Sequence, residues 1–370
     1  MYKHLFPTAQ THCYLDTAAE GLPPQCVFDA LNEYWREKSR GTPGRLQHYE
    51  VQREAEIAVA SLLGAPKDDV VLLSNTSDAL NLLAQGIDWN PGDEVVIGDL
   101  EFPSNVVVWL RLRALGVRLH VVASSDGETR LEDWTPHITQ RTRVVAVSQV
   151  SYKSGTQIPF LKELSAAAHN AGALFVVDAT QTLGRVPVHV EGVDYLVASS
   201  YKWLLATHGL AVVYCAPALR EKLQYATAGW YSIDQVFHPG RFSTYTPKAN
   251  AGCLQAGMPN FPALYAMNAS VRFLLQAGVE QIDARLKPVV ERLRAGLAAQ
   301  GRQLLTPPGA EYASGIVSFA DPAPEALMAR LAERGVVVWG GDGRIRASLH
   351  LYNDDADVGQ LLHALRSLRQ

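Results

Sequence analysis

The sequence predicts an α/β fold in which a mostly parallel, seven-stranded sheet is sandwiched by helices and is followed by a smaller α+β domain. Two observations support this prediction. Val-rich apolar runs alternate with amphipathic stretches through the first part of the chain, and the pattern changes after about residue 245. Continuous apolar strands that alternate with helices are typical of a parallel sheet buried on both faces. Such a sheet binds its ligands beyond the carboxyl ends of the strands.

Each strand of the sheet is expected from a short apolar run. The runs span residues 69–74, 93–99, 118–124, 142–150, 173–179, 194–200 and 210–215. Helical periodicity predicts helices between them over residues 76–87, 103–116 and 158–172. A long helical stretch is expected from residue 263 to about residue 301. The strands "SGIVSFA", "VVVWGG" and "RIRASLHLYN" and the helices "PEALMARLAERG" and "DVGQLLHALRSL" complete the chain.

These elements divide the chain into three parts. An N-terminal segment over residues 1–20 is expected to pack with the small domain. Residues 21–245 form the large domain, and residues 246–370 form the small C-terminal domain. The division near residue 245 follows a loop rich in Gly, Asn and Pro, "TPKANAGCLQAGMPNFPA".

Composition narrows the class of protein. The chain has 370 residues and a formal net charge of −4, which gives no electrostatic reason to expect nucleic acid or an anionic membrane as a partner. No apolar run is long enough to span a bilayer, and the first residues do not resemble a secretory signal. The 4 cysteines are scattered without a CxxC motif, so we expect reduced thiols in a cytoplasmic protein. The 11 histidines show no metal-ligand spacing, so no metal is expected.

Two charged residues directly follow apolar strands. Asp178 ends the run "ALFVVDA", and a desolvated carboxylate there needs a cationic partner such as a protonated pyridine nitrogen. Lys202 follows "DYLVASS" and stands between Tyr201 and Trp203, where lost hydration would make its amine nucleophilic and suited to a Schiff base with an aldehyde. The alternatives are an Asp that caps a turn and a Lys that reaches the surface.

The stretch "LSNTSDALNLL" takes the chain from a strand into a helix. Free N–H groups and hydroxyls at a helix N-terminus bind anions, so Thr76 and Ser77 are candidates for holding a phosphate. Simple capping by Asn75 or Thr76 is the alternative, and both functions can coexist.

Six motifs occur in order along the chain: "NTSDALN", "EFPSN", "VSYKSGT", "VVDATQ", "SSYKWL" and "IRASLHLYN". Their order and spacing resemble the class V aminotransferase branch of fold-type I pyridoxal-phosphate (PLP) enzymes. That branch includes cysteine desulfurases, kynureninases and isopenicillin N epimerase-like proteins. The resemblance runs from "YLDTAAEGLPP" to "LYNDDADV" and implies a PLP cofactor, an amino-acid substrate and a homodimer.

The resemblance also implies roles for residues around the cofactor. Lys202 would form the internal aldimine and move the substrate α-proton, and Asp178 would pair with the pyridine N–H. Gln181 would lie near the phenolic oxygen. The phosphate would be held by the hydroxyls of Thr76, Ser77, Ser199 or Ser200, and Tyr201.

Aromatic and cationic residues would complete the substrate side of the site. Phe102 falls where the family stacks an aromatic ring on the pyridine, and phenylalanine cannot transfer a proton. Arg346 matches the arginine that binds the substrate α-carboxylate, a role suited to its planar fork. Tyr152 would be near the cofactor or substrate. Trp230 would wall the substrate pocket, in its own subunit or the neighbouring one.

The chain departs from the desulfurase pattern at two places. Desulfurases carry a nucleophilic cysteine shortly before the carboxylate-binding arginine, but the matching stretch here, "RGVVVWGGDGRIR", has none. A persulfide mechanism needs that thiolate, so we expect no desulfurase activity in the strict sense. The family's Gly-Thr is here Gly257-Met258, which removes a hydroxyl that contacts phosphate.

Several reactions remain open. The aromatic residues and the missing cysteine favour a lyase that cleaves a carbon–sulfur or carbon–carbon bond in the side chain of an amino-acid-derived substrate. Transamination or epimerisation are the alternatives. Ser199-x-x-Lys202 also has the spacing of an acyl-enzyme serine hydrolase, but its companion motifs are missing. A protein that binds PLP without turnover is the last alternative, and the complete set of Lys202, Asp178 and Arg346 argues against it.

Overall fold

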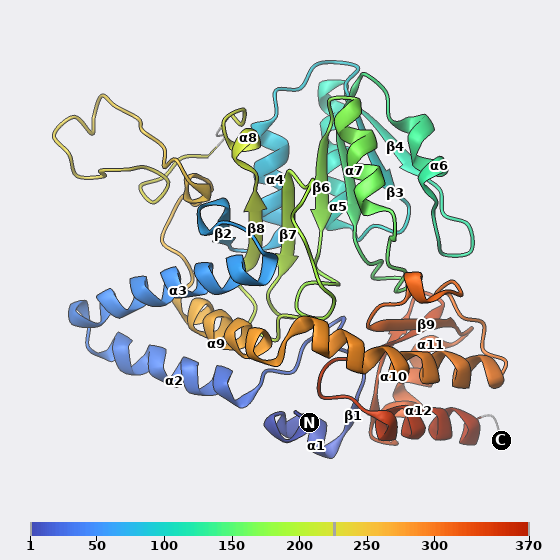
Figure 1. Cartoon of the computed structure of the whole chain (residues 1–370). Helices are drawn as coiled ribbons and strands as arrows, with labels where there is room; N and C mark the ends of the chain where they lie inside the picture. The colour runs from blue at the N-terminus through green and yellow to red at the C-terminus, as the bar shows by residue number, and fades with distance from the viewer. Residues whose placement is uncertain (1, 225–226, 369–370) are drawn as a thin grey trace.

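The computed structural model describes residues 2–224 and 227–368 and confirms the predicted α/β architecture (Figure 1). The central sheet has 7 strands in the order β2-β8-β7-β6-β5-β3-β4. The strands are β2 (Val70–Leu73), β3 (Glu94–Gly98), β4 (Arg118–Val122), β5 (Thr142–Ser148), β6 (Leu174–Asp178), β7 (Tyr195–Ser199) and β8 (Ala211–Cys215). All neighbouring pairs are parallel except those that β8 makes with β2 and β7, which are antiparallel.

Both faces of the sheet are buried, as the apolar strands predict. Alternate residues of β5 enter two different clusters, with Val145 and Val147 on one face and Val144 and Ala146 on the other. The helices of the first face are α2 (Gln25–Ser39), α3 (Arg45–Leu63), α7 (Leu161–Asn170) and α9 (Phe261–Ala277). Those of the second face are α4 (Thr76–Gly86), α5 (Ser104–Leu110) and α8 (Pro217–Arg220). Helices on both faces are expected for parallel strands, because such strands are apolar on both sides and must be kept from water.

The long helix expected from residue 263 to residue 301 is two helices. The structure ends α9 at Ala277 and starts α10 (Val279–Ala299) after Gly278, whose φ of +73° lies in the left-handed region. Glycine enters that region at little steric cost, so it separates two helices that periodicity alone joins. The predicted helix over residues 103–116 likewise becomes α5 followed by a 3₁₀ turn over Arg111–Leu115.

A smaller sheet carries the last part of the chain. Its antiparallel order is β11-β12-β9, from β9 (Ile316–Ala320), β11 (Trp339–Gly341) and β12 (Arg344–Ser348), with α11 (Pro324–Ala332) and α12 (Asp355–Ser367) packed beside it. The N-terminal elements are α1 (Pro7–Thr11) and β1 (Cys13–Tyr14), and β1 pairs in parallel with β10 (Val336–Val337). The short helix α6 (Leu131–Trp134) precedes β5.

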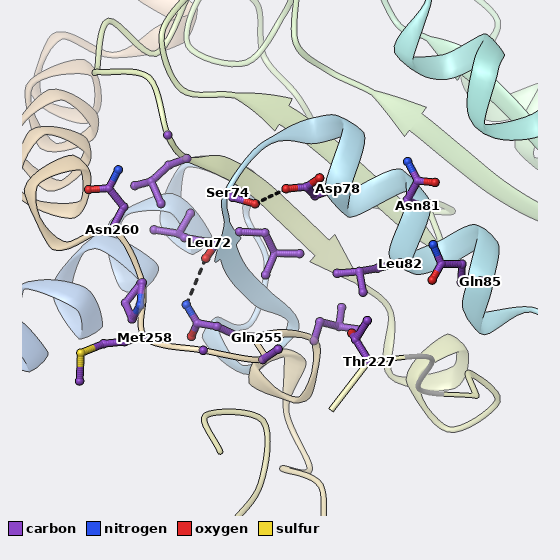
Figure 2. A pocket seen from close by; sticks show the side chains of 17 residues that line it. Leu72, Ser74, Asp78, Asn81, Leu82, Gln85, Thr227, Gln255, Met258 and Asn260 are labelled. Carbon is purple, nitrogen blue, oxygen red and sulfur yellow. Dashed lines mark hydrogen bonds between the residues drawn. The ribbon is translucent and has the colours of Figure 1, made fainter. Parts of the chain in front are cut away.

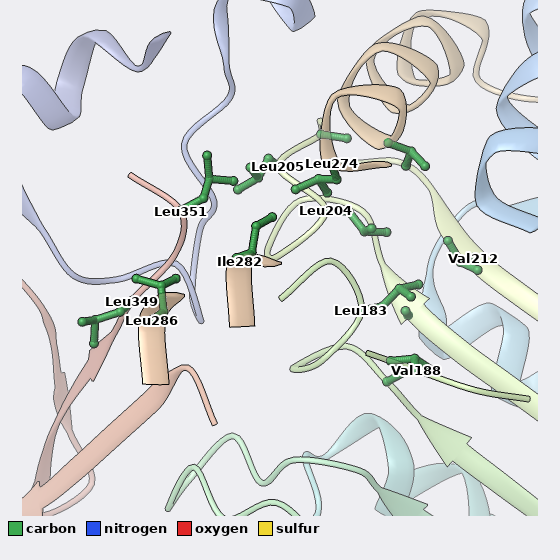
Figure 3. Close-up of a cluster of buried hydrophobic side chains, with 14 of the residues drawn as sticks. Leu183, Val188, Leu204, Leu205, Val212, Leu274, Ile282, Leu286, Leu349 and Leu351 are labelled. Carbon is green, nitrogen blue, oxygen red and sulfur yellow. The ribbon is translucent and has the colours of Figure 1, made fainter. Parts of the chain in front are cut away.

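An apolar cluster joins the two sheets (Figure 3). Leu204 and Leu205, which follow Lys202, lie in the same cluster as Ile282 and Leu286 of α10 and as Leu349 beyond β12. This packing fixes the chain around Lys202 relative to the end of β12. Among the described residues, none of the helices combines the length and the apolar character that crossing a bilayer requires.

Candidate active site

A cavity of about 190 Å³ opens where β5, β6 and β7 end and α4 begins. Parallel strands present their carboxyl ends at one edge of the sheet, so residues far apart in sequence meet there. Nine of the predicted site residues line this cavity: Thr76, Ser77, Phe102, Tyr152, Asp178, Gln181, Ser199, Tyr201 and Lys202.

Lys202 is held in place by hydrogen bonds to the backbone on either side of it. The Gly21 N–H donates to the Tyr201 carbonyl at 2.8 Å, and His350 Nε2 lies 2.9 Å from the Trp203 carbonyl oxygen. Gly21 lies so close that a Cβ there would overlap the Lys202 carbonyl oxygen. The backbone therefore fixes the position from which the amine enters the cavity.

The Lys202 amine is prepared for nucleophilic chemistry. Its Nζ lies 5.3 Å from the ring centroid of Phe102 and 5.6 Å from that of Tyr201. Burial, followed by the nearby positive charge of Arg346, lowers the pKa of Lys202 to about 8. A much larger fraction of the amine is therefore neutral near physiological pH than for an exposed lysine.

We expect this lowered pKa to control how fast the apoprotein captures PLP. Only the neutral amine attacks an aldehyde, so the capture rate should rise with pH with a midpoint near 8 and not near the ordinary 10.5. The measurement is the rate at which visible absorbance appears when apoprotein and excess PLP are mixed over a pH series. Nα-acetyl-lysine, whose amine is fully hydrated, is the matched control. A protein midpoint equal to that of the control would contradict the prediction.

Asp178 lies at the bottom of the cavity at the end of β6. Its Oδ1 accepts a hydrogen bond of 2.9 Å from the Thr180 N–H, and the residue is only 5% exposed. Burial raises the pKa of Asp178, while the Thr180 hydrogen bonds and the Lys202 charge act in the opposite direction. A buried carboxylate with so few donors is suited to pair with a cationic N–H of a ligand.

The opposite end of the cavity is the N-terminus of α4. Asn75 caps this helix, since its Oδ1 accepts a hydrogen bond of 2.8 Å from the Asp78 N–H. Helix capping by Asn75, which was the alternative to phosphate binding, therefore occurs. The Thr76 and Ser77 side chains still line the cavity. Hydroxyls and N–H groups at a helix N-terminus suit a phosphate.

Of the two serines before Lys202, only Ser199 lines the cavity. The Ser200 hydroxyl is fully buried and lies 2.6 Å from the Thr207 carbonyl oxygen and 2.7 Å from that of Leu210. Strand alternation points neighbouring residues to opposite sides, so only one of the pair can face the cavity. Of the two serines predicted to contact the phosphate, only Ser199 is therefore in a position to do so.

Gln181 and Phe102 both line the cavity, but the protein makes different contacts with each side chain. The protein holds the Gln181 amide in place, because its Oε1 accepts from Trp203 Nε1 at 2.7 Å and its Nε2 donates to the Ala18 carbonyl at 3.1 Å. The Phe102 ring is 43% exposed and makes an edge contact with Tyr152 at 5.1 Å between centroids. Phe102 therefore presents a free aromatic face to a flat ligand.

Arg346 reaches the site from β12. Its Nη1 donates to the Tyr152 carbonyl at 3.1 Å, and its Nη2 lies 3.5 Å from Asp16 Oδ1. Its buried Nε has no hydrogen-bond partner among the described residues. The guanidinium thus keeps capacity for a ligand carboxylate beside the cavity.

Sequence reasoning missed two acids near this site. Asp16 is half-buried, and burial raises its pKa to about 6 despite the opposing charge of Arg346. Glu101 is buried, accepts hydrogen bonds from the N–H and hydroxyl of Ser148 at 2.7 and 2.6 Å, and has a pKa raised by burial to about 7. Glu101 begins the motif "EFPSN" and Asp16 lies in "YLDTAAEGLPP", but only the tertiary structure shows how far each acid is removed from water.

Trp230 does not line this cavity. It is 46% exposed and contacts Tyr231 at 5.3 Å between ring centroids, on the long loop before α9. A second cavity of about 440 Å³ lies on the other side of the α4 N-terminus, between α4 and residues 254–260, with Met258 and Asn260 at its edge (Figure 2). The homodimer, and the role of Trp230 as a wall of the substrate pocket in its own or the neighbouring subunit, stay predictions.

The residues of the first cavity fit PLP in their chemistry. An amine of lowered pKa faces the space from one strand end, and a buried carboxylate faces it from the next. A helix N-terminus with two hydroxyl side chains supplies a phosphate site, and the exposed ring of Phe102 supplies a stacking surface. Lys202, Asp178, Thr76, Ser77 and Phe102 would each meet a different part of the cofactor.

Comparisons with known proteins agree with this chemistry. The family model described as aminotransferase class-V matches residues 13–361. A probable cysteine desulfurase from Methanothermobacter thermautotrophicus is 30% identical over 98% of this chain and 96% of its own, and the uncharacterized aminotransferase YcbU from Bacillus subtilis is 28% identical over 96% and 94%. The apo structure of a cysteine desulfurase from Thermococcus onnurineus NA1 superposes with a TM-score of 0.91 at 27% identity, covering 99% of this chain and 97% of that one.

Proposed function

Because the chain belongs to the aminotransferase class-V family and is a PLP-dependent enzyme, we propose that it cleaves the side chain of an amino acid or an amino-acid derivative. The bond broken would be a carbon–sulfur or carbon–carbon bond. The observation that carries this proposal is a complete set of Lys202, Asp178 and Arg346 around a cavity that no cysteine lines in the described part of the chain.

Each part of the set has a distinct task. Bound PLP supplies an electron sink for the negative charge left on the substrate α-carbon. Asp178 would hold the ring nitrogen in its protonated form, which would keep that sink effective. Arg346 binds the substrate carboxylate and so orients the α-hydrogen. Lys202, with a pKa near 8, takes the α-proton, and its pKa is close to the pH at which it must both accept and release that proton.

The thiols support direct cleavage over sulfur transfer to the protein. Cys13, Cys215 and Cys253 are buried, and Cys26 is half-buried on α2 beside α9. Burial raises the pKa of Cys13, Cys26 and Cys215, which keeps them as unreactive thiols. A sulfur-containing group would therefore leave with the product. Phe102 cannot protonate it, which favours a leaving group that is stable as an anion.

Transamination is the second candidate, because one relative at 28% identity is named an aminotransferase. It would use the same Lys202 proton transfer, with the proton returned to the cofactor instead of a side-chain bond breaking. The geometry of Lys202, Asp178 and Arg346 serves both reactions. Products therefore decide between them.

The test is a product screen of the holoenzyme with a panel of amino acids that includes cysteine, cystine and kynurenine. We expect a side-chain fragment to be released, with either alanine or equal amounts of keto acid and ammonia as the other product. Keto acid without ammonia, with conversion of PLP to pyridoxamine phosphate, would establish transamination instead.

Cys26→Ser is the matched control, because Cys26 is the most exposed of the four thiols. We expect unchanged turnover in this variant. Alanine formed together with sulfur bound to a protein cysteine, lost in Cys26→Ser, would contradict direct cleavage.

A further inference from the structure

A second buried arginine stands beside Arg346. Arg344 lies two residues earlier on β12, on the same face of the strand, and is 1% exposed. Its Nε, like that of Arg346, is buried without a hydrogen-bond partner among the described residues. Two neighbouring guanidinium groups with unused donors require an explanation, because buried charges are normally paired and hydrogen-bonded.

Among the residues that the structure describes, Arg344 forms an ion pair with only one carboxylate. That group is Asp342, 2.5 Å from Arg344 Nη1, and its side chain is 66% exposed in the turn between β11 and β12. A pair with one exposed partner is screened by water and contributes little. The ion pair with Asp342 therefore does not offset the free-energy cost of burying the positive charge of Arg344.

The two arginines share one aromatic surface. The guanidinium carbons of Arg344 and Arg346 lie 4.6 and 5.3 Å from the ring centroid of Trp339. Burial lowers the pKa of Arg346, Asp16 opposes this change, and the positive charge on Arg344 lowers the pKa further, so the two guanidinium groups repel each other. Asp16 faces Arg346 at 3.5 Å and, with a pKa that burial raises to about 6, it can offset one of the two positive charges near neutral pH. This end of the site has more buried positive charge than its acids offset.

Tyr152 connects Arg344 to the cavity. The Tyr152 ring lines the cavity, touches Phe102 edge-on, and lies 5.6 Å from the guanidinium carbon of Arg344. Arg346 donates to the carbonyl of the same tyrosine. A substrate held by its α-carboxylate at Arg346 could therefore extend its side chain along Tyr152 toward Arg344.

We propose that Arg344 is a specificity-determining residue that binds a second acidic group, carried at the end of the substrate side chain, while Arg346 binds the α-carboxylate. The proposal rests on the proposed function, since it names the substrate class of that site. It predicts that this enzyme selects amino acids with anionic side chains over neutral ones of the same shape.

Two pairs of near-isosteric amino acids test the proposal. Aspartate with asparagine, and glutamate with glutamine, differ in charge and hardly in size. Kd values for the holoenzyme follow from the change in the visible absorbance of bound PLP. We expect the acidic member of at least one pair to bind about ten-fold tighter or more, the scale of a charge-assisted hydrogen bond.

Variants then assign the preference to Arg344. In Arg344→Gln the acidic member should lose its advantage while the neutral member keeps its Kd, and in Arg344→Lys the advantage should shrink but persist. Arg334→Gln, which changes an exposed arginine of the same part of the chain, should leave the ratio unchanged.

Equal Kd values within both pairs for the wild-type enzyme would overturn the proposal, and so would an unchanged ratio in Arg344→Gln. Where the glutamine variant does not fold, Arg344→Lys makes the assignment, and an undiminished ratio in that variant would overturn the proposal. If no amino acid changes the spectrum, both the proposed function and the role of Arg344 fail. If all amino acids change the spectrum without a preference for acids, only the assignment of Arg344 fails.

Discussion

Replacing Lys202 by alanine is expected to abolish the covalent attachment of PLP to the protein and to lower turnover by about a thousand-fold or more. Lys202 is the only lysine that lines the cavity in the described part of the chain, and its backbone is fixed by Gly21 and His350. No neighbouring amine can therefore replace it. The measurement is the visible absorbance and intact mass of the holoprotein before and after borohydride, together with turnover on the best substrate of the panel.

Lys153→Ala is the matched control for this experiment. Lys153 is exposed next to Tyr152 and outside the cavity lining, so its loss should leave both absorbance and mass increase unchanged. A Lys202→Ala protein that is still fixed to PLP by borohydride would show that another lysine carries the cofactor. A wild-type protein that stays colourless with PLP would return attention to Ser199 as a nucleophile beside Lys202.

The strands and their alternation with helices could be predicted because those signals are local. An apolar run of about five residues such as "ALFVV" leaves few alternatives to a buried strand, and the structure places β6 there. The break at Gly278 was not predicted, because helical periodicity continues across it and only the backbone conformation differs. Periodicity reports which face is buried and carries little information on where a helix ends.

The features of the candidate site also divide into those that the sequence predicts and those that only the structure shows. Lys202 and Asp178 could be found because a charge directly after an apolar strand conflicts with burial, and that conflict is visible in sequence. The hydrogen bonds of the Gln181 amide and of the buried Ser200 hydroxyl depend on how other parts of the chain fold around them. The unmatched charge of Arg344 also depends on a fold-level fact, namely that its one carboxylate is exposed. Sequence motifs thus located most of the residues that line the cavity, while the structure shows which of their side chains are already bonded to the protein.

Replacing Asp178 by asparagine is expected to leave PLP bound but to lower turnover by about a hundred-fold or more, on the scale of losing a proton-holding group. Asparagine keeps the size of the side chain and an oxygen that can accept from the Thr180 N–H, so the loop should keep its shape. It cannot hold the ring nitrogen in the protonated form. We expect the Kd for PLP to change less than turnover does, and parallel titrations of absorbance and rate measure both.

Although Asp178→Asn is expected to lower turnover, it should not lower the stability of the apoprotein. Because burial raises the pKa of Asp178, the folded apoprotein binds its proton more tightly than the unfolded chain does. Stability is therefore lost as the pH rises from the unfolded pKa through the folded pKa, and this loss is the cost of burying the charged carboxylate. Asp178→Asn removes that cost, so its apoprotein Tm should equal or exceed that of the wild type.

With PLP bound, the order should reverse, because a protonated ring nitrogen stabilises the wild-type carboxylate and has no charged partner in the variant. Asp99→Asn is the control, since Asp99 also follows a strand but is exposed, and both of its Tm values should match the wild type. Equal losses of Tm with and without PLP in Asp178→Asn would mean that Asp178 serves only the fold. A crossing of the two orders would mean that the protein retains an unfavourable buried charge because the cofactor compensates for it.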